Sequence, residues 1–283
     1  MQTSDSSSSR RIFFKTVLAS TLGAAITGGT AAAFSQDTLQ VWSCGGLAEA
    51  MIPANALFEK NTGVKIAYTG AFAAALGKSL LGSGQTEVFA GRVLDLAKKL
   101  RESGKMEYFK PLCFTSYVMV TPKGNPAQIR GIEDMAKPGI RVVLAPEASP
   151  PGGQAVQALL KKAGIQEAVT KNAIIQGSCV QRTMDELIGA KGDVSIVELR
   201  ITRMQEFSGK LEVLPIPEQF FPPPPLTFTV GVMKNARDRA LADAYVEFVT
   251  CPEGQAFFER QGFIPAISGK GRELIEKLGV KDV

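Results

Sequence analysis

The chain has 283 residues, 45% of them apolar, and its 32 lysines and arginines outnumber its 27 aspartates and glutamates for a formal net charge of +5. No cluster of basic residues alternates with aromatic ones, so the composition does not indicate a nucleic-acid-binding surface. Histidine is absent, which excludes Ser-His-Asp and Cys-His nucleophilic sites and histidine-ligated metals. The four cysteines form no CxxC pair, which excludes a zinc ribbon and a thioredoxin-like motif.

The N-terminal segment has the parts of a removable export peptide. Arg10 and Arg11 lie in the run 9–15 (SRRIFFK), which leads into an uncharged, weakly apolar stretch and a small-residue end at 31–33 (AAA). The stretch is too short and too rich in glycine and threonine to span a bilayer well. The segment 1–33 resembles a twin-arginine export signal. The resemblance implies cleavage near residue 33, a periplasmic mature protein and the twin-arginine translocase as a partner, with an uncleaved membrane anchor as the alternative.

After the signal, short apolar strands alternate with helices of similar length. Strands are expected at 38–42, 64–68, 87–90, 117–120, 140–144, 194–197 and 227–232, and helices at 47–62, 73–81, 93–102, 154–163, 179–188, 238–249 and 253–261. Turns at 43–46, 70–72 and 150–153 precede three of these helices, and the run 222–225 (PPPP) is expected to be a stiff connection or a polyproline ligand. The alternation is typical of βαβ units and predicts an α/β fold with mostly parallel sheets.

Four short motifs follow one another along the chain in an informative order. They are 58–64 (FEKNTGV), 87–90 (EVFA), 121–126 (TPKGNP) and 252–263 (PEGQAFFERQGF). These motifs are similar to F-E-K-x-T-G-V, A-D-V-F-A, V-P-K-G-N-P and P-E-A-Q-x-x-F-E-x-x-G-F of the molybdate-type periplasmic solute-binding proteins that serve ABC importers. Because the order and spacings agree, the stretch from 39 to 262 resembles this family.

The resemblance implies a type II periplasmic binding protein fold with two lobes joined by two crossover strands. Lobe 1 would comprise residues 34–120 and 226–283, and lobe 2 residues 121–225. A small molecule or ion would bind between helix N-termini, whose free N–H groups and partial positive charge favour an oxyanion such as molybdate or tungstate. The partner would be an ABC permease in the inner membrane, and the protein would have no catalytic role.

The candidate ligand-binding residues lie at the turns before four helices and at the end of one strand. They are Cys44, Gly45, Gly46, Phe72, Ala73, Gly152, Gly153, Cys179, Val180 and Glu198. In the family that the chain resembles, hydroxyl side chains of the first two loops and a tyrosine at a strand end commonly contact the anion. This chain has Gly46 and Ala73 in place of the hydroxyl side chains and Glu198 in place of the tyrosine. An ionised Glu198 would repel a dianion unless it is protonated or paired, which weakens the case for molybdate.

The two cysteines among these candidates open further hypotheses. Cys44, Cys179 and Glu198 could coordinate a thiophilic metal such as zinc or copper. Alternatively, Cys44 and Cys179 form a disulfide or hold a thiol-reactive or organic ligand near Trp42. Each cysteine could also be simply a small buried apolar residue. For Glu198, the alternative is an ion pair with Arg200. A third hypothesis is a periplasmic redox or cofactor-carrying subunit with the same fold.

Overall fold

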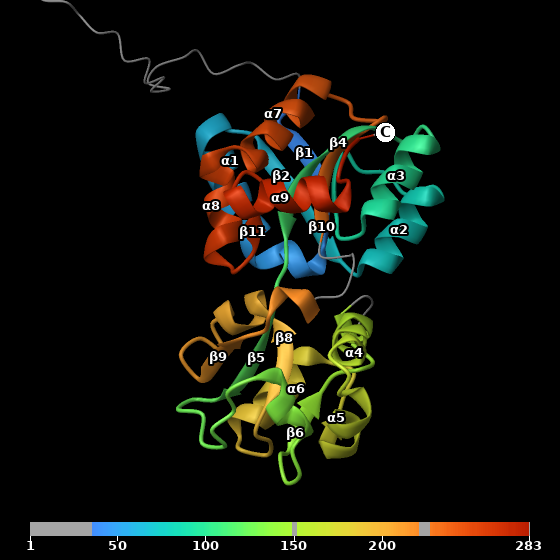
Figure 1. Cartoon of the computed structure of the whole chain (residues 1–283). Coiled ribbons are helices and arrows are strands. Elements are labelled where there is room, and N and C mark those ends of the chain that lie inside the picture. The colour runs from blue at the N-terminus through green and yellow to red at the C-terminus, as the bar shows by residue number, and fades with distance from the viewer. Residues whose placement is uncertain (1–35, 149–151, 221–226, 283) are drawn as a thin grey trace, which may run out of the picture. The chain divides into compact units, whose positions relative to one another are not determined.

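A computed structural model describes residues 36–148, 152–220 and 227–282 of the chain (Figure 1). The predicted export signal at 1–33 and the predicted stiff connection at 222–225 lie outside the described residues, as do residues 150–151 of the predicted turn. None of the helices in the described ranges has the length and apolarity that a membrane crossing requires.

Six strands of the described residues form one sheet in the order β11-β4-β10-β3-β1-β2. Their bounds are Thr38–Cys44 for β1, Lys65–Ala71 for β2, Val88–Gly91 for β3, Met106–Phe114 for β4, Thr227–Met233 for β10 and Ile264–Pro265 for β11. Strand β1 pairs in parallel with β2 and β3, whereas β10 pairs antiparallel with β3 and β4, and β4 with β11. This first sheet therefore combines segments from both ends of the described chain.

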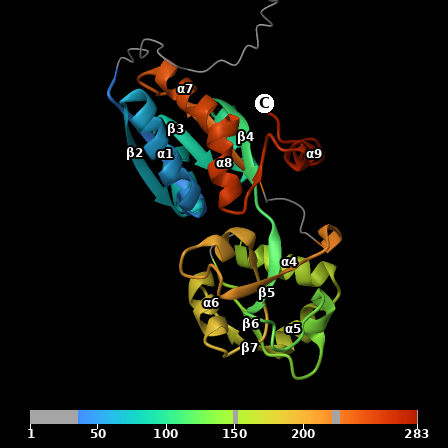
Figure 2. The same cartoon turned by 90° about the vertical axis from the view of Figure 1, so that its left-hand side faces the viewer.

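Helices cover both faces of the first sheet. Their bounds are Ala48–Thr62 for α1, Ala73–Leu81 for α2, Leu94–Glu102 for α3, Arg239–Thr250 for α7, Pro252–Arg260 for α8 and Gly269–Leu278 for α9. Figure 2 shows α1, α7 and α8 over the strands, and Val41 of β1 shares an apolar core with Met51 of α1 on this face. On the other face, Phe89 of β3 shares a core with Leu80 of α2 and Leu100 of α3, since successive strand residues point to opposite faces.

A second group of strands lies between β4 and β10 in the sequence. Strands β5 (Tyr117–Pro122), β8 (Ser195–Glu198) and β9 (Leu211–Pro215) form an antiparallel sheet in the order β8-β5-β9, while β6 (Val142–Leu144) and β7 (Ala173–Gln176) pair in parallel. An isolated parallel bridge from Val142 to Val194 joins β6 to the residue directly before β8. Helices α4 (Gly152–Lys162), α5 (Gln166–Asn172) and α6 (Val180–Ile188) pack against these strands, and α6 supplies Met184 and Leu187 to the core under Val197 of β8.

Most predicted elements are confirmed within a few residues. The predicted helix at 73–81 is α2, and the predicted helix start at 179 is one residue before α6. Among the described strands, parallel pairing joins β1 to β2 and to β3, and β6 to β7, with one further parallel bridge from Val142 to Val194. The other pairs are antiparallel, so parallel pairs are fewer than expected. The predicted change of lobe at 120/121 falls inside β5, all of which belongs to the second group of strands.

Strand β4 was not predicted because Pro111, Glu107 and Lys110 interrupt its apolar pattern. The pairing of β4 with β10 shifts by one residue at this point, since Thr229 lies opposite Pro111 and Phe228 lies opposite Cys113. Proline has no N–H to donate to the ladder and is tolerated at such bulges. The bulge therefore explains how a proline-containing segment becomes an inner strand of the first sheet.

Candidate functional site

The carboxyl ends of β1, β2 and β3 lie at one edge of the first sheet, because the three strands are parallel. Cys44, the last residue of β1, lies opposite Ala71, the last residue of β2. The residues that follow the three strands are Gly45, Phe72 and Arg92. In open α/β sheets, ligands bind outside the carboxyl ends of the strands. This edge is therefore the first place to look for a binding site.

A pocket of about 350 Å³ lies at this edge. Its lining includes residues next to the strands of the first sheet and residues from the second group of strands and its helices. The lining residues are Cys44, Gly45, Gly46, Glu49, Phe72, Ala73, Arg92, Ala148, Gly152, Ser178, Cys179, Val180, Gln181, Glu198, Arg200 and Ile201. The ten candidate residues named from the sequence are all in this set except Gly153. The structure thus brings together candidates that are spread over more than 150 positions of the chain, from Cys44 to Glu198.

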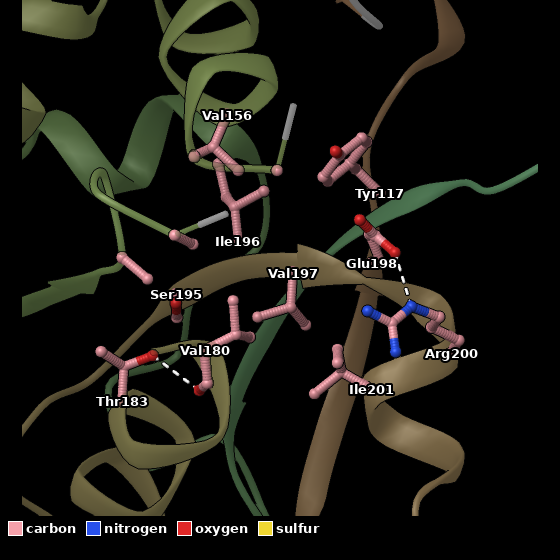
Figure 3. A pocket seen from close by; sticks show the side chains of 14 residues that line it. Tyr117, Val156, Val180, Thr183, Ser195, Ile196, Val197, Glu198, Arg200 and Ile201 are labelled. Atoms are coloured by element: carbon pink, nitrogen blue, oxygen red, sulfur yellow. Dashed lines mark hydrogen bonds and ion pairs between the residues drawn. The ribbon is translucent and has the colours of Figure 1, made fainter. Parts of the chain in front are cut away.

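Gly153 lies beside the pocket and has a packing role. It lines a neighbouring cavity of about 30 Å³, shown in Figure 3, together with Tyr117, Val180 and Glu198. A Cβ atom at position 153 would lie 2.1 Å from the carbonyl oxygen of Pro146, which is closer than any real contact. Glycine is therefore required for the close approach of these two backbone segments.

Helix N-termini converge on the pocket. Helix α2 begins after Phe72 and α6 begins after Cys179, and neither of these preceding side chains caps its helix. The first bonds within the two helices run from the N–H of Leu76 to the carbonyl of Phe72 and from the N–H of Thr183 to the carbonyl of Cys179. The N–H groups before these have no partner inside their helix, and the dipole adds a partial positive charge. Helix α4 begins at Gly152, also in the lining.

Glu198, at the end of β8, is held between two arginines. Its Oε1 accepts a hydrogen bond from an Nη of Arg92, and its Oε2 accepts one from Nε of Arg200 at 2.7 Å. The side chain is buried, and burial alone would raise the pKa of this carboxyl group, but the charges of Arg92 and Arg200 outweigh burial and lower it. Glu198 is therefore an ionised carboxylate, and the trio has two positive charges against one negative.

Two buried polar atoms beside Glu198 lack a hydrogen-bond partner among the described residues. Nε of Arg92 and the hydroxyl of Tyr117 have no hydrogen-bond partner among the described residues, although both side chains are buried. Burial and the charge of Glu198 raise the pKa of Tyr117, so its hydroxyl stays protonated. Figure 3 shows the tyrosine ring beside the Glu198 carboxylate. Buried polar groups are normally paired, so orphan atoms at a pocket point to an additional partner.

Gly46 lies beside the guanidinium group of Arg200. A Cβ atom at position 46 would lie 3.4 Å from both Cζ and Nη2 of the Arg200 guanidinium. This distance is an ordinary van der Waals contact, so position 46 lies directly against the charged group of Arg200.

The four cysteines all lie in the described part of the chain and are free thiols. Cys44 is buried, and burial raises the pKa of its thiol, whereas Cys179 is exposed, with its Sγ 3.5 Å from Oε1 of Gln181. Among the described residues, no group of three or more Cys, Asp or Glu side chains could hold a metal ion. Cys44, Cys179 and Glu198 thus do not assemble the predicted metal centre, because both Glu198 oxygens bind arginines.

Arg92 and Glu49 are pocket residues that the sequence analysis did not name. Arg92 follows β3 directly, so the rule that parallel strands end at the same edge would have indicated it. Glu49 lies in the first turn of α1, and its Oε2 is buried without a partner among the described residues. The pairing of Glu198 with Arg200, which was one alternative, is confirmed.

The fold and the pocket define a two-lobed solute-binding protein. A family model described as bacterial extracellular solute-binding protein matches residues 39–264. The chain therefore belongs to the family of bacterial extracellular solute-binding proteins. The predicted fold class is confirmed by solved structures of two-lobed periplasmic binding proteins.

Relatives and solved structures indicate the range of this fold. The chain is 22% identical over 214 residues to the molybdate-binding protein ModA of Mycobacterium tuberculosis, covering 72% of this chain and 75% of that protein. It is similar to the substrate-binding domain assigned to a molybdenum ABC transporter of Clostridium difficile, with a TM-score of 0.71, 18% identity and coverage of 81% of this chain and 98% of that chain. The periplasmic molybdate-binding protein of Azotobacter vinelandii matches with a TM-score of 0.65 and 16% identity, over 80% of this chain and 98% of that chain. Iron-bound HitA from Pseudomonas aeruginosa matches with a TM-score of 0.63 and 16% identity, over 83% of this chain and 88% of that chain.

Proposed function

We propose that this protein is the periplasmic solute-binding component of an ABC importer and that it binds an anionic solute in the 350 Å³ pocket. The observation that carries the proposal is the trio of Arg92, Glu198 and Arg200, in which Arg92 and Glu198 are buried and Arg200 is partly buried. The trio by itself carries a net positive charge, and it lies in the same lining as the first residues of α2 and α6. Relatives that are named for molybdate support an oxyanion such as molybdate or tungstate as an inorganic candidate.

The electrostatics favour an anion in two ways. A helix N-terminus carries roughly half a positive charge in its first turn, and α2, α4 and α6 each begin with a residue of the pocket lining. An arginine guanidinium presents several N–H donors in a planar fork that suits carboxylate, phosphate and similar groups. The Glu198 carboxylate, which would repel an anion by itself, is neutralised by its two partners.

A binding role needs only these contacts and a membrane partner. The permease would receive the solute from the pocket, and the protein would carry out no chemical conversion. Export through the twin-arginine route, which the run 9–15 supports, would let the protein fold before it reaches the periplasm.

Thermal unfolding with and without anions tests this function. A ligand that binds only the folded state raises the melting temperature in proportion to the logarithm of its concentration. The panel is molybdate, tungstate, sulfate, phosphate and small carboxylates at 1–10 mM, about 10³–10⁴ times a micromolar dissociation constant. We expect at least one of these anions to raise the melting temperature. Choline chloride and the chloride salts of the same cations serve as controls.

Arginine variants connect any shift to the pocket. We expect Arg200→Gln to abolish the shift, and Arg203→Gln, which changes a neighbouring residue outside the lining, to retain it. If no anion stabilises the protein, or if Arg200→Gln responds like the unmodified protein, the proposed function is wrong.

A further inference from the structure

The pocket has more features than the binding of an inorganic oxyanion requires. We infer that its ligand is an organic carboxylate with an apolar body and a hydrogen-bond donor, an inference that rests on the proposed anion-binding function. Three observations on the lining residues carry it: the volume, an exposed aromatic ring, and an unpartnered acidic side chain.

The volume exceeds the needs of a small tetrahedral ion. The pocket measures about 350 Å³, and one water occupies about 30 Å³ of liquid, so the space corresponds to roughly a dozen waters. Pockets for organic ligands begin at about 300 Å³. A tetrahedral oxyanion with five heavy atoms would fill only part of this space and would keep much of its hydration.

Phe72 gives the pocket an exposed aromatic wall. Its side chain is 71% exposed although it lines the pocket and stands directly before the first turn of α2. Nearby lining residues are also apolar, among them Ala73, Val180 and Ile201. An apolar group of a ligand would cover the ring while the adjacent N–H groups of α2 hold its carboxylate. A fully hydrated inorganic ion would gain nothing from this ring.

Glu49 adds an acceptor where an oxyanion would need donors. Its Oε2 is buried in the pocket lining without a hydrogen-bond partner among the described residues. A carboxylate oxygen accepts hydrogen bonds and repels the oxygens of a dianion. A hydroxyl or ammonium group on the ligand would satisfy it.

The charges of the lining agree with a monoanion. Arg92 and Arg200 are balanced by Glu49 and Glu198, so the side chains are formally neutral and the helix N-termini supply the remaining attraction. The orphan Nε of Arg92, on a side chain that is 6% exposed, is one donor available to the carboxylate.

Isothermal titration calorimetry with matched anions tests this inference. The organic probes are acetate, phenylacetate, which adds an aromatic ring to acetate, and mandelate, which adds a hydroxyl group to phenylacetate. The inorganic probes are molybdate, tungstate, sulfate and phosphate. We expect phenylacetate to bind at least tenfold more tightly than acetate and than each inorganic ion, and mandelate to bind more tightly still.

Three variants assign the gains to residues. Phe72→Ala should weaken phenylacetate binding at least fivefold and change acetate binding less than twofold. Ile52→Ala, which removes another exposed apolar side chain, one outside the lining, should leave both unchanged. Glu49→Gln should reduce the advantage of mandelate over phenylacetate.

The possible results distinguish failure of the inferred organic carboxylate from failure of the proposed anion-binding function. An inorganic ion that binds more tightly than every carboxylate, or a phenylacetate affinity that is independent of Phe72, would overturn the inference and leave anion binding intact. Absence of binding by both the carboxylates and the inorganic ions would overturn the proposed function as well.

Discussion

Arg92 and Glu198 are 106 positions apart in the sequence and form a buried ion pair between the end of β3 and the end of β8. Each side chain is less than a tenth exposed. The pair links the first sheet to the second group of strands directly at the pocket. Four predictions about this pair and the surrounding residues can be tested on the purified protein.

Removal of Arg92 should destabilise the fold. We expect Arg92→Gln to lower the free energy of unfolding by about 3 kcal/mol, because it leaves the buried Glu198 with one partner instead of two. Urea unfolding followed by fluorescence of Trp42 measures this change. Arg239→Gln is the control, since Arg239 pairs with Asp243 and Glu107 near the surface and exposed pairs contribute about 1 kcal/mol or less. Equal losses in the two variants would contradict the role given to burial.

Acid should weaken the Glu198 pair selectively. The pKa of Glu198 is lowered in the folded protein, while an unfolded glutamate has a pKa of about 4.3. The pair's contribution is therefore complete above this value and is lost as the pH falls through the folded-state pKa.

We expect the urea midpoint to fall more steeply with pH below about 4.3 in the unmodified protein than in Glu198→Gln. Other buried carboxylates such as Glu87, whose pKa is also lowered, titrate in both proteins and cancel in the comparison. Identical pH slopes would show that folding does not lower the pKa of Glu198.

The thiols should differ in reactivity. Cys179 is exposed, whereas Cys44 and Cys113 are buried and have raised pKa values because of burial. With iodoacetamide at neutral pH, we expect Cys179 to be alkylated at least tenfold faster than these two, since the thiolate is the nucleophile. Peptide mapping by mass spectrometry measures the rates, and reaction in urea gives the fully exposed reference. Rapid alkylation of Cys44 in the folded protein would contradict its burial.

Adjacent glycines at the start of α4 provide a matched pair. Gly153→Ala should lower the free energy of unfolding by about 2 kcal/mol or more, because its Cβ would meet the carbonyl of Pro146 at 2.1 Å. For Gly152→Ala we expect a change within about 0.5 kcal/mol, since no atom of the described residues lies within 4 Å of the added Cβ. Similar losses for the two variants would mean that the packing at Gly153 is not the cause.

Local patterns in the sequence predicted the helix starts and strand ends that form the pocket. Helix α2 begins at the predicted Ala73, whereas β1 and β8 end at Cys44 and Glu198, which lie two residues and one residue beyond the predicted strand ends. Such features depend on short apolar runs and on glycine-containing turns.

The pairing inside the pocket could not be predicted in the same way. Arg92 meets Glu198 only after two strands from distant segments reach one edge, and the burial of Glu49 depends on packing around α1. The predicted metal centre at Cys44, Cys179 and Glu198 was reasonable on residue type. In the part of the chain that the structure describes, no such group of ligands comes together, and two guanidinium groups bind the Glu198 carboxylate. A sequence pattern does not show which of several neighbours a carboxylate will pair with.

The two arginines also matter for the kinetics and selectivity of binding. Long side chains usually lose about 0.5–1.5 kcal/mol of rotational freedom when a ligand immobilises them. Glu198 holds Arg92 and Arg200 by both of its oxygens, so folding has already restricted them before a solute enters. An incoming solute meets guanidinium groups in fixed orientations, and this preorganisation favours selection among solutes by geometry over selection by charge alone.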